Sequence, residues 1–141
     1  MALLPEDRAR LIKYADFLET ELSDFPRFSR IGWKKYNEDR DARRNIERWV
    51  ENIVSCSIDM AKVLLVAEGR DIPPTYKEVV RAIGALPHFD EKLGDELSRW
   101  VALRNVIAHE YLDLSWARIE KFLKSAEPSY CSLVTAVKAI L

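Results

Sequence analysis

Cysteine is scarce in this chain of 141 residues, which contains only Cys56 and Cys131. Neither has a second cysteine or a histidine at metal-ligand spacing, so the sequence predicts no metal site, and no motif indicates another cofactor. Both cysteines lie within apolar helical patterns, and we expect them to be buried free thiols in a reducing cytoplasm.

Long apolar runs are absent as well. None follows the N-terminal sequence, which continues with Pro5, Glu6 and Asp7, and this argues against a signal peptide and against a membrane span. We therefore expect a cytoplasmic protein with no membrane partner.

The chain also has no excess of charge of one sign. Its 22 lysines and arginines and 23 acidic residues give a formal net charge of -1 at pH 7. No global basic field points to a nucleic acid, which counts against avid RNA binding but leaves room for a local basic patch. A Gly-rich phosphate loop, a zinc spacing, a Gly-x-Ser-x-Gly motif and a distinct carboxylate pair are missing too.

What the chain does have is apolar residues recurring three and four positions apart, with no alternating strand pattern. Pro5, followed by two acidic residues, predicts a first helix that ends near Leu22. The aromatic segment from Ser23 to Tyr36 is expected to be a packed connection with a helical turn. A long second helix should begin at about Asp39.

Helix-start signals recur in the second half of the chain. Thr75 opens a third helix with a capping box, and Asp90 is the candidate cap of a fourth, in which Gly94 is expected to be a tolerated weak point. Asp113 or Ser115 should cap a fifth helix. The sequence therefore predicts an all-α fold, an up-and-down bundle of about five helices in a single domain that covers the whole chain, residues 1–141.

The stretch from Leu103 to Tyr111 departs from an ordinary helical pattern. On a helical wheel, an arginine falls within an otherwise apolar stripe made of Leu93, Leu97, Trp100, Arg104, Ile107 and Tyr111. Burying a guanidinium there costs several kcal/mol unless anions or hydrogen-bond acceptors meet it. The opposite side of the helix, with Asn105 and His109, is only moderately polar, so we expect a second packing face that could meet another chain.

Four arginines cluster in the first turns of the long second helix: Arg40, Arg43, Arg44 and Arg48. Acidic residues are interleaved with them, so one interpretation is a solvated, salt-bridged face. The other is that part of this cluster reaches towards RNA phosphate. The sequence leaves both interpretations open.

The spacing Arg-x-x-x-x-His-x-Tyr, formed by Arg104, His109 and Tyr111 near the end of a penultimate helix, resembles the HEPN superfamily and specifically its HepT-like ribonuclease toxins. The segment from Asp41 to Ala61 looks like the long second helix of that family. Pro74 to Glu78 also has a familiar place between that helix and the motif. The resemblance covers most of the chain and implies a HEPN-like helical fold.

The resemblance implies metal-independent RNA cleavage, in which a ribose 2′-hydroxyl attacks the neighbouring phosphate, by the toxin of a type VII-like HEPN/nucleotidyltransferase toxin-antitoxin pair. The residue types suit this chemistry. A histidine such as His109 can exchange protons with the 2′-hydroxyl or the leaving oxygen near neutral pH. Arg104 offers a fork of donors to the phosphate, and Asn105 is placed to orient the imidazole or to hold a phosphate oxygen.

On a regular helix, Arg104 and His109 point about 140° away from each other. Either the helix loosens around His109 or a second chain completes the site. HEPN ribonucleases are similar in using a dimer whose two motifs face one cleft. We therefore expect a two-fold homodimer packed through the motif helix.

Tyr111 has a separate implied role. In HepT-like toxins the tyrosine of this motif accepts AMP groups from a minimal nucleotidyltransferase antitoxin, and the added negative charge would repel RNA. The alternative is that Tyr111 continues the apolar stripe and belongs to the core.

Two other functions stay open at this point. The chain could be a non-catalytic helical module that docks a nucleotidyltransferase. It could also be a purely structural helical dimer in which Arg104 pairs with a buried carboxylate such as Asp95 or Glu96.

Overall fold

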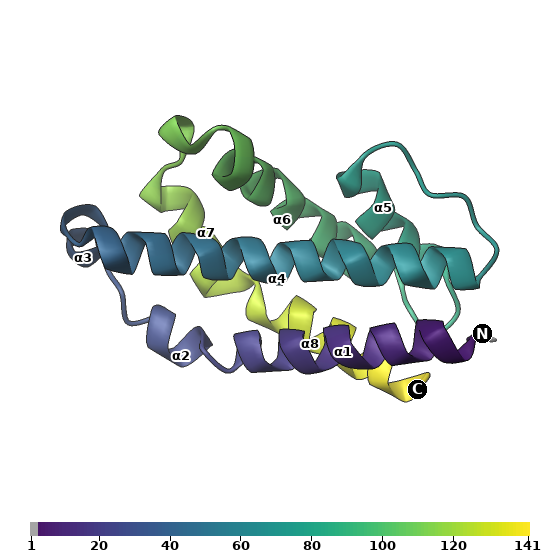
Figure 1. The fold of residues 1–141 in the computed structure, drawn as a ribbon. Coiled ribbons are helices and arrows are strands. Elements are labelled where there is room, and N and C mark those ends of the chain that lie inside the picture. Colours follow the sequence, from purple (N-terminus) through teal and green to yellow (C-terminus); the bar gives the residue numbers. More distant parts are fainter. Residues whose placement is uncertain (1–2) are drawn as a thin grey trace.

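The computed structural model describes residues 3–141, and within them it contains helices and no strand (Figure 1). This confirms the predicted all-α fold. In chain order the elements are α1 (Pro5–Leu22), α2 (Phe25–Phe28), α3 (Trp33–Glu38), α4 (Arg40–Ala67), α5 (Tyr76–Ala82), the 3-10 turn η1 (Ile83–Ala85), α6 (Glu91–His109), the 3-10 turn η2 (Tyr111–Asp113), α7 (Trp116–Ser125) and α8 (Glu127–Ala139).

The long helix α4 is the central element of the bundle. It packs against α1 on one side and against α5 and α6 on the other, and α8 packs against α1 and α6. Successive long helices alternate in direction, and the start of α1 and the end of α8 lie at the same end of the molecule (Figure 1). There the Arg8 side chain donates a hydrogen bond to the Leu141 carbonyl oxygen. The core includes the fully buried side chains Leu11, Leu18, Ile46, Ile53, Leu64, Leu97, Phe122 and Tyr130.

Three helices begin where the sequence predicts, and side-chain caps explain why. Asp39 accepts hydrogen bonds from the backbone N–H groups of Ala42 and Asp41, which lowers the pKa of its carboxyl group. Thr75 and Asp90 cap α5 and α6 in the same way. Ser115 occupies the cap position of α7 but makes no capping hydrogen bond, and Asp113 lies in η2 instead.

The predicted aromatic connection contains two short helices, α2 and α3. Phe25 and Phe28 of α2 are buried against Trp49, with ring centroids 4.7 and 4.6 Å from the indole.

Of the two thiols expected to be buried, Cys56 is buried, and desolvation raises its pKa to about 12. The prediction for Cys131 is wrong, because its side of α8 faces solvent. None of the helices in residues 3–141 is long and apolar enough to cross a membrane.

Gly94 is also different from the prediction of a tolerated weak point. A Cβ atom at this position would lie 2.6 Å from the carbonyl oxygen of Arg81 and 3.1 Å from the backbone nitrogen of Gly84. The missing side chain lets α6 approach α5 and η1 closely, so the glycine is a packing requirement.

Gly94→Ala should therefore destabilise the protein by about 1–3 kcal/mol, since backbone atoms would have to move to make room for the methyl group. Urea denaturation of both proteins measures the difference. Gly32→Ala is the matched control, because nothing lies within 4 Å of a Cβ atom there. Equal stability of the Gly94 and Gly32 variants would contradict the close helix approach.

Candidate functional site

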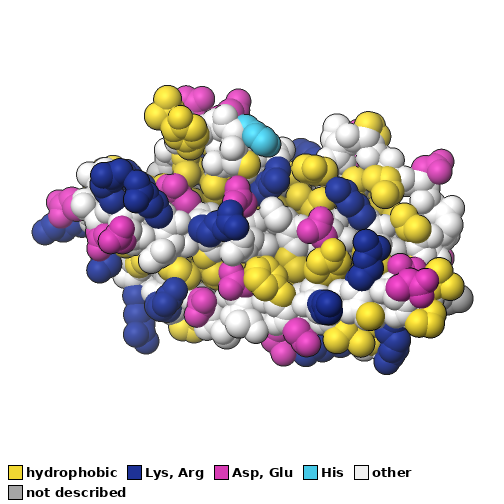
Figure 2. Space-filling model, in the orientation of Figure 1, with side chains coloured by type: hydrophobic (Ala, Val, Ile, Leu, Met, Phe, Trp, Pro, Cys, Tyr) yellow, Lys and Arg dark blue, Asp and Glu magenta, His cyan; other side chains and the backbone are white. Residues whose placement is uncertain are grey.

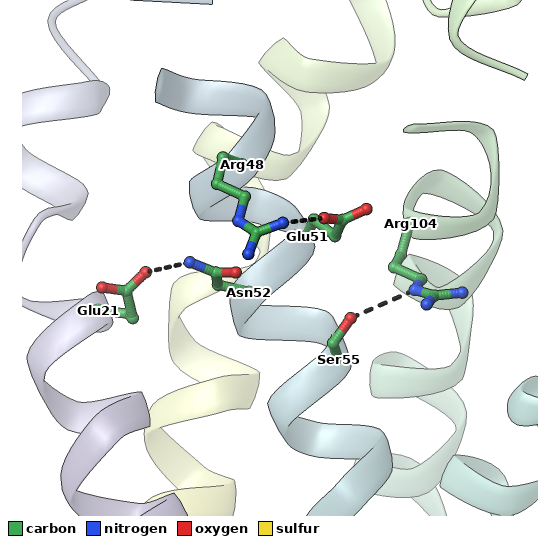
Figure 3. A network of polar contacts seen from close by, with 6 residues as sticks. All are labelled: Glu21, Arg48, Glu51, Asn52, Ser55 and Arg104. Atoms are coloured by element: carbon green, nitrogen blue, oxygen red, sulfur yellow. Dashed lines mark hydrogen bonds and ion pairs between the residues drawn. The ribbon is translucent and has the colours of Figure 1, made fainter. Parts of the chain in front are cut away.

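Arg104 is half-buried on α6, and its guanidinium is held from three directions. Its Nε atom donates a hydrogen bond of 3.3 Å to Ser55 Oγ on α4, and its Nη1 atom donates one of 3.1 Å to Asn105 Oδ1. Figure 3 shows the side chain reaching from α6 across to Ser55. The guanidinium carbon also lies 5.3 Å from the ring centroid of Tyr76. These contacts give the guanidinium a fixed orientation.

The carboxylates of Asp95 and Glu96, the candidate partners of Arg104, contact other residues. Asp95 pairs with Arg81 at 3.5 Å, and Glu96 accepts a 2.7 Å hydrogen bond from Ser129. Among residues 3–141, no ion pair includes Arg104. The interpretation of Arg104 as one half of a structural ion pair with Asp95 or Glu96 is therefore wrong, and its positive charge stays available to an anion.

Two cations lie over the ring of Tyr76, at the start of α5. Lys62 Nζ is 4.8 Å from the ring centroid, and the guanidinium carbon of Arg104 is 5.3 Å from it. Such contacts stabilise a cation by about 0.5–1 kcal/mol at exposed sites. Tyr76 and Ser55 are the two positioning residues that sequence reasoning missed. Each comes from a different helix, and helical periodicity within α4 or α5 contains no signal for a contact with α6.

His109 is the last residue of α6, and its side chain is exposed. The helix stays regular up to this residue, so it does not loosen to bring His109 back towards Arg104. Within the described residues, the side-chain hydrogen bonds of Arg104 go to Ser55 and Asn105 and not to His109. Within one chain, Arg104 and His109 therefore lie on the same helix but make no hydrogen bond with each other in the described residues.

Tyr111 lies beyond the end of α6, in η2, and therefore does not continue the helical stripe. Its side chain is 69% exposed and that of the next residue, Leu112, is 88% exposed. The alternative that Tyr111 belongs to the core is wrong. The helical wheel failed here because the backbone leaves the helix at Glu110, which has φ -132° and ψ 42°.

Tyr111 lines a cleft of about 700 Å³ between η2 and the start of α7 on one side and α3 and the start of α4 on the other. Aromatic and cationic side chains share its walls: Trp33, Tyr36, Trp116, Arg40, Arg43 and Arg44. The Tyr36 hydroxyl donates a 2.6 Å hydrogen bond to Glu47 Oε2. Burial and this hydrogen bond raise the pKa of Tyr36, so its hydroxyl stays protonated.

The four arginines of the predicted basic cluster separate into two groups. Arg40, Arg43 and Arg44 line the cleft, and among residues 3–141 no ion pair includes them. Arg48 instead pairs with Glu51 at 3.1 Å (Figure 3). Figure 2 shows lysine and arginine side chains gathered at the end of the molecule where α3 and the start of α4 lie. The salt-bridged interpretation therefore fits Arg48 alone.

The described residues contain no group of three or more His, Cys, Asp or Glu side chains arranged to hold a metal ion. The motif residues Arg104, Asn105, His109 and Tyr111 provide a guanidinium, an amide, an imidazole and a phenol. A guanidinium and an imidazole suit an anionic substrate that exchanges protons.

Comparison with known proteins gives one family match. The model described as ribonuclease HepT-like matches residues 18–137, which include the motif residues and the cleft. No curated protein sequence matches the chain.

The solved structures with this fold include the following three. YutE, a cytosolic protein of unknown function from Bacillus subtilis, has a TM-score of 0.82 at 19% identity, over 96% of this chain and 90% of that one. A toxin-antitoxin with AMP-PNP has a TM-score of 0.82 at 14% identity, over 93% and 98%. The tri-AMPylated Shewanella oneidensis HEPN toxin in complex with MNT antitoxin has a TM-score of 0.81 at 15% identity, over 92% and 97%.

Proposed function

Because the chain belongs to the HepT-like ribonuclease family, we propose that it is an endoribonuclease, the toxin of a HEPN/nucleotidyltransferase toxin-antitoxin pair. The observation that carries this proposal is the half-buried guanidinium of Arg104, which is held by Ser55, Asn105 and Tyr76 and has no carboxylate partner in residues 3–141. A charge fixed in this way, on the helix that ends in an exposed histidine, suits a phosphodiester substrate.

The proposed reaction needs no group beyond the RNA and the protein. The 2′-oxygen forms a bond to phosphorus, and the bond from phosphorus to the 5′-oxygen breaks. A histidine takes the proton of the 2′-hydroxyl, and a protonated histidine gives a proton to the departing 5′-oxygen. The products are a 2′,3′-cyclic phosphate and a 5′-hydroxyl. Arg104 stabilises the charge on the non-bridging oxygens, and Asn105, which accepts a hydrogen bond from Arg104, supports that orientation.

The two histidine roles and the separation of Arg104 from His109 both favour a homodimer. Two residues five positions apart on a regular helix point about 140° away from each other, so one copy does not easily place both on one phosphate. We propose that two copies pack through α6 with their motifs facing one cleft, so that each copy provides one His109.

Tyr111 is the proposed acceptor of AMP groups. Its side chain is 69% exposed at the tip of η2, where a partner enzyme can reach the hydroxyl. A HEPN toxin with the same fold is tri-AMPylated and bound to MNT antitoxin. We propose that the antitoxin of this chain is a minimal nucleotidyltransferase and that the two proteins act in the cytoplasm. We also propose that residues 1–141 form a single domain.

A second candidate is a non-catalytic module that docks such a nucleotidyltransferase. The observation in its favour is the exposed apolar tip formed by Tyr111 and Leu112, which a partner could cover. It differs from the first proposal in predicting partner binding without RNA cleavage.

The test is incubation of the purified protein with a single-stranded RNA in the presence of EDTA. The expected result is cleavage that leaves 2′,3′-cyclic phosphate and 5′-hydroxyl ends, identified by mass spectrometry. The same sequence with 2′-O-methyl groups should stay intact, because its nucleophile is blocked. Cleavage that requires a divalent metal would contradict the proposed mechanism, and the absence of any cleavage would favour the docking module.

A further inference from the structure

We propose that the cleft beside Tyr111 is a binding subsite for one nucleotide of single-stranded RNA, with its base on the aromatic wall and its phosphate on the arginines. This inference rests on the proposed ribonuclease function and adds a place where the substrate is held away from the cleaved bond. The cleft volume of about 700 Å³ lies within the usual range of small-ligand pockets, about 300–1,000 Å³.

The cationic wall is formed by one face of α4. Arg43 and Arg44 lie three and four residues after Arg40, so each is a neighbour of Arg40 on the helix surface, and all three line the cleft. The acidic residue in the lining, Glu47, accepts the hydroxyl hydrogen of Tyr36 at 2.6 Å. The guanidinium groups therefore outnumber the carboxylates, and a phosphate would find several donors on one side of the cleft.

The aromatic wall is formed by α3 and the start of α7. Trp33 is 57% exposed, which is high for a large apolar side chain. Trp116 is more buried and is braced by Tyr36, with ring centroids 5.0 Å apart. Exposed aromatic faces beside a row of cations are the combination with which proteins bind single strands, because every base can stack and every nucleotide has a phosphate.

The position of the cleft fits the path of a bound strand. Ser55, which holds Arg104, and Arg44, which lines the cleft, are separated by about 16 Å along α4 at 1.5 Å per residue. His109 and Tyr111 occupy the adjoining end of α6 and η2. A strand whose scissile phosphate meets Arg104 can therefore place a nucleotide further along the strand in the cleft. An adenylate on Tyr111 would occupy the same space and so compete with RNA.

The experiment measures binding without cleavage, with a fluorescent 2′-O-methyl hexanucleotide as the probe and anisotropy as the readout. Trp33→Ala should raise Kd roughly tenfold through the loss of stacking. Plots of log K for association against log salt have a negative slope, and Arg43→Gln and Arg44→Gln should each reduce the magnitude of that slope by about 0.7. The matched control is Arg48→Gln, which changes an arginine of the same helix that pairs with Glu51 outside the cleft and should bind like the wild type.

The result that would overturn the subsite is wild-type affinity and salt dependence in all three cleft variants. Thermal melting checks that each variant is folded. The two proposals fail separately: cleavage of RNA together with unaffected binding in the cleft variants removes the subsite and keeps the ribonuclease. Weakened probe binding in a protein that cleaves no RNA keeps the subsite and removes the ribonuclease.

Discussion

His109→Ala is expected to lower the rate constant of RNA cleavage by about 10²–10⁴-fold, the usual contribution of a positioned acid or base. The side chain is exposed at the end of α6, so its removal should leave the fold and the melting temperature unchanged. The control is His88→Asn, which removes the other histidine of the chain from the exposed turn before α6 and keeps a residue that tolerates the φ of 73° at this position. Undiminished cleavage by the His109 variant would contradict a catalytic role of the imidazole.

The same variant tests the proposed active site between the two copies of the homodimer. If that site needs a histidine from each copy, a dimer with a single His109 is inactive. An equal mixture of wild type and His109→Ala, after random exchange of subunits, should then retain about a quarter of the wild-type rate, because only that share of the dimers has both histidines. A value near half would show that each copy works alone.

The starts of the helices could be predicted because they depend on local chemistry. Asp39, Thr75 and Asp90 each accept a hydrogen bond from a backbone N–H two or three residues further along the chain, and such a contact is visible in the sequence itself. Gly94 and Cys131 could not be predicted in this way. The first depends on where Arg81 and Gly84 lie in space, and the second on which side of α8 the other helices cover.

In the candidate site, too, local features could be predicted from the sequence and contacts between helices could not. The positions of Arg104 and His109 on one helix followed from their spacing. Two of the three groups that hold Arg104 come from other helices, Ser55 of α4 and Tyr76 of α5, which are 49 and 28 residues away in the chain. The wheel placed Tyr111 beside Arg104 because it assumed a helix that in fact ends at His109. Because of that early end, Tyr111 lines the cleft together with three arginines that the sequence showed only as a charged cluster.

Arg104→Ala should lower the rate constant of cleavage by about 10²–10³-fold, the effect of removing one donor to a developing oxyanion. Arg104→Lys should recover only a small part of this loss. Lysine restores the charge but not the planar fork that donates to Ser55 and Asn105 and leaves further N–H groups for a phosphate. Arg99→Ala, on the exposed side of the same helix, is the control and should cleave at the wild-type rate.

Ser55→Ala separates the orientation of the guanidinium from its charge. The charge stays, but the hydrogen bond that holds Nε is lost, so kcat should fall by a smaller factor than in Arg104→Ala, while binding of the 2′-O-methyl probe stays unchanged. Full activity of Arg104→Lys would mean that a point charge is enough, and the geometric role of Ser55 would then be wrong. Full activity of Arg104→Ala would mean that the guanidinium does not act on the phosphate at all.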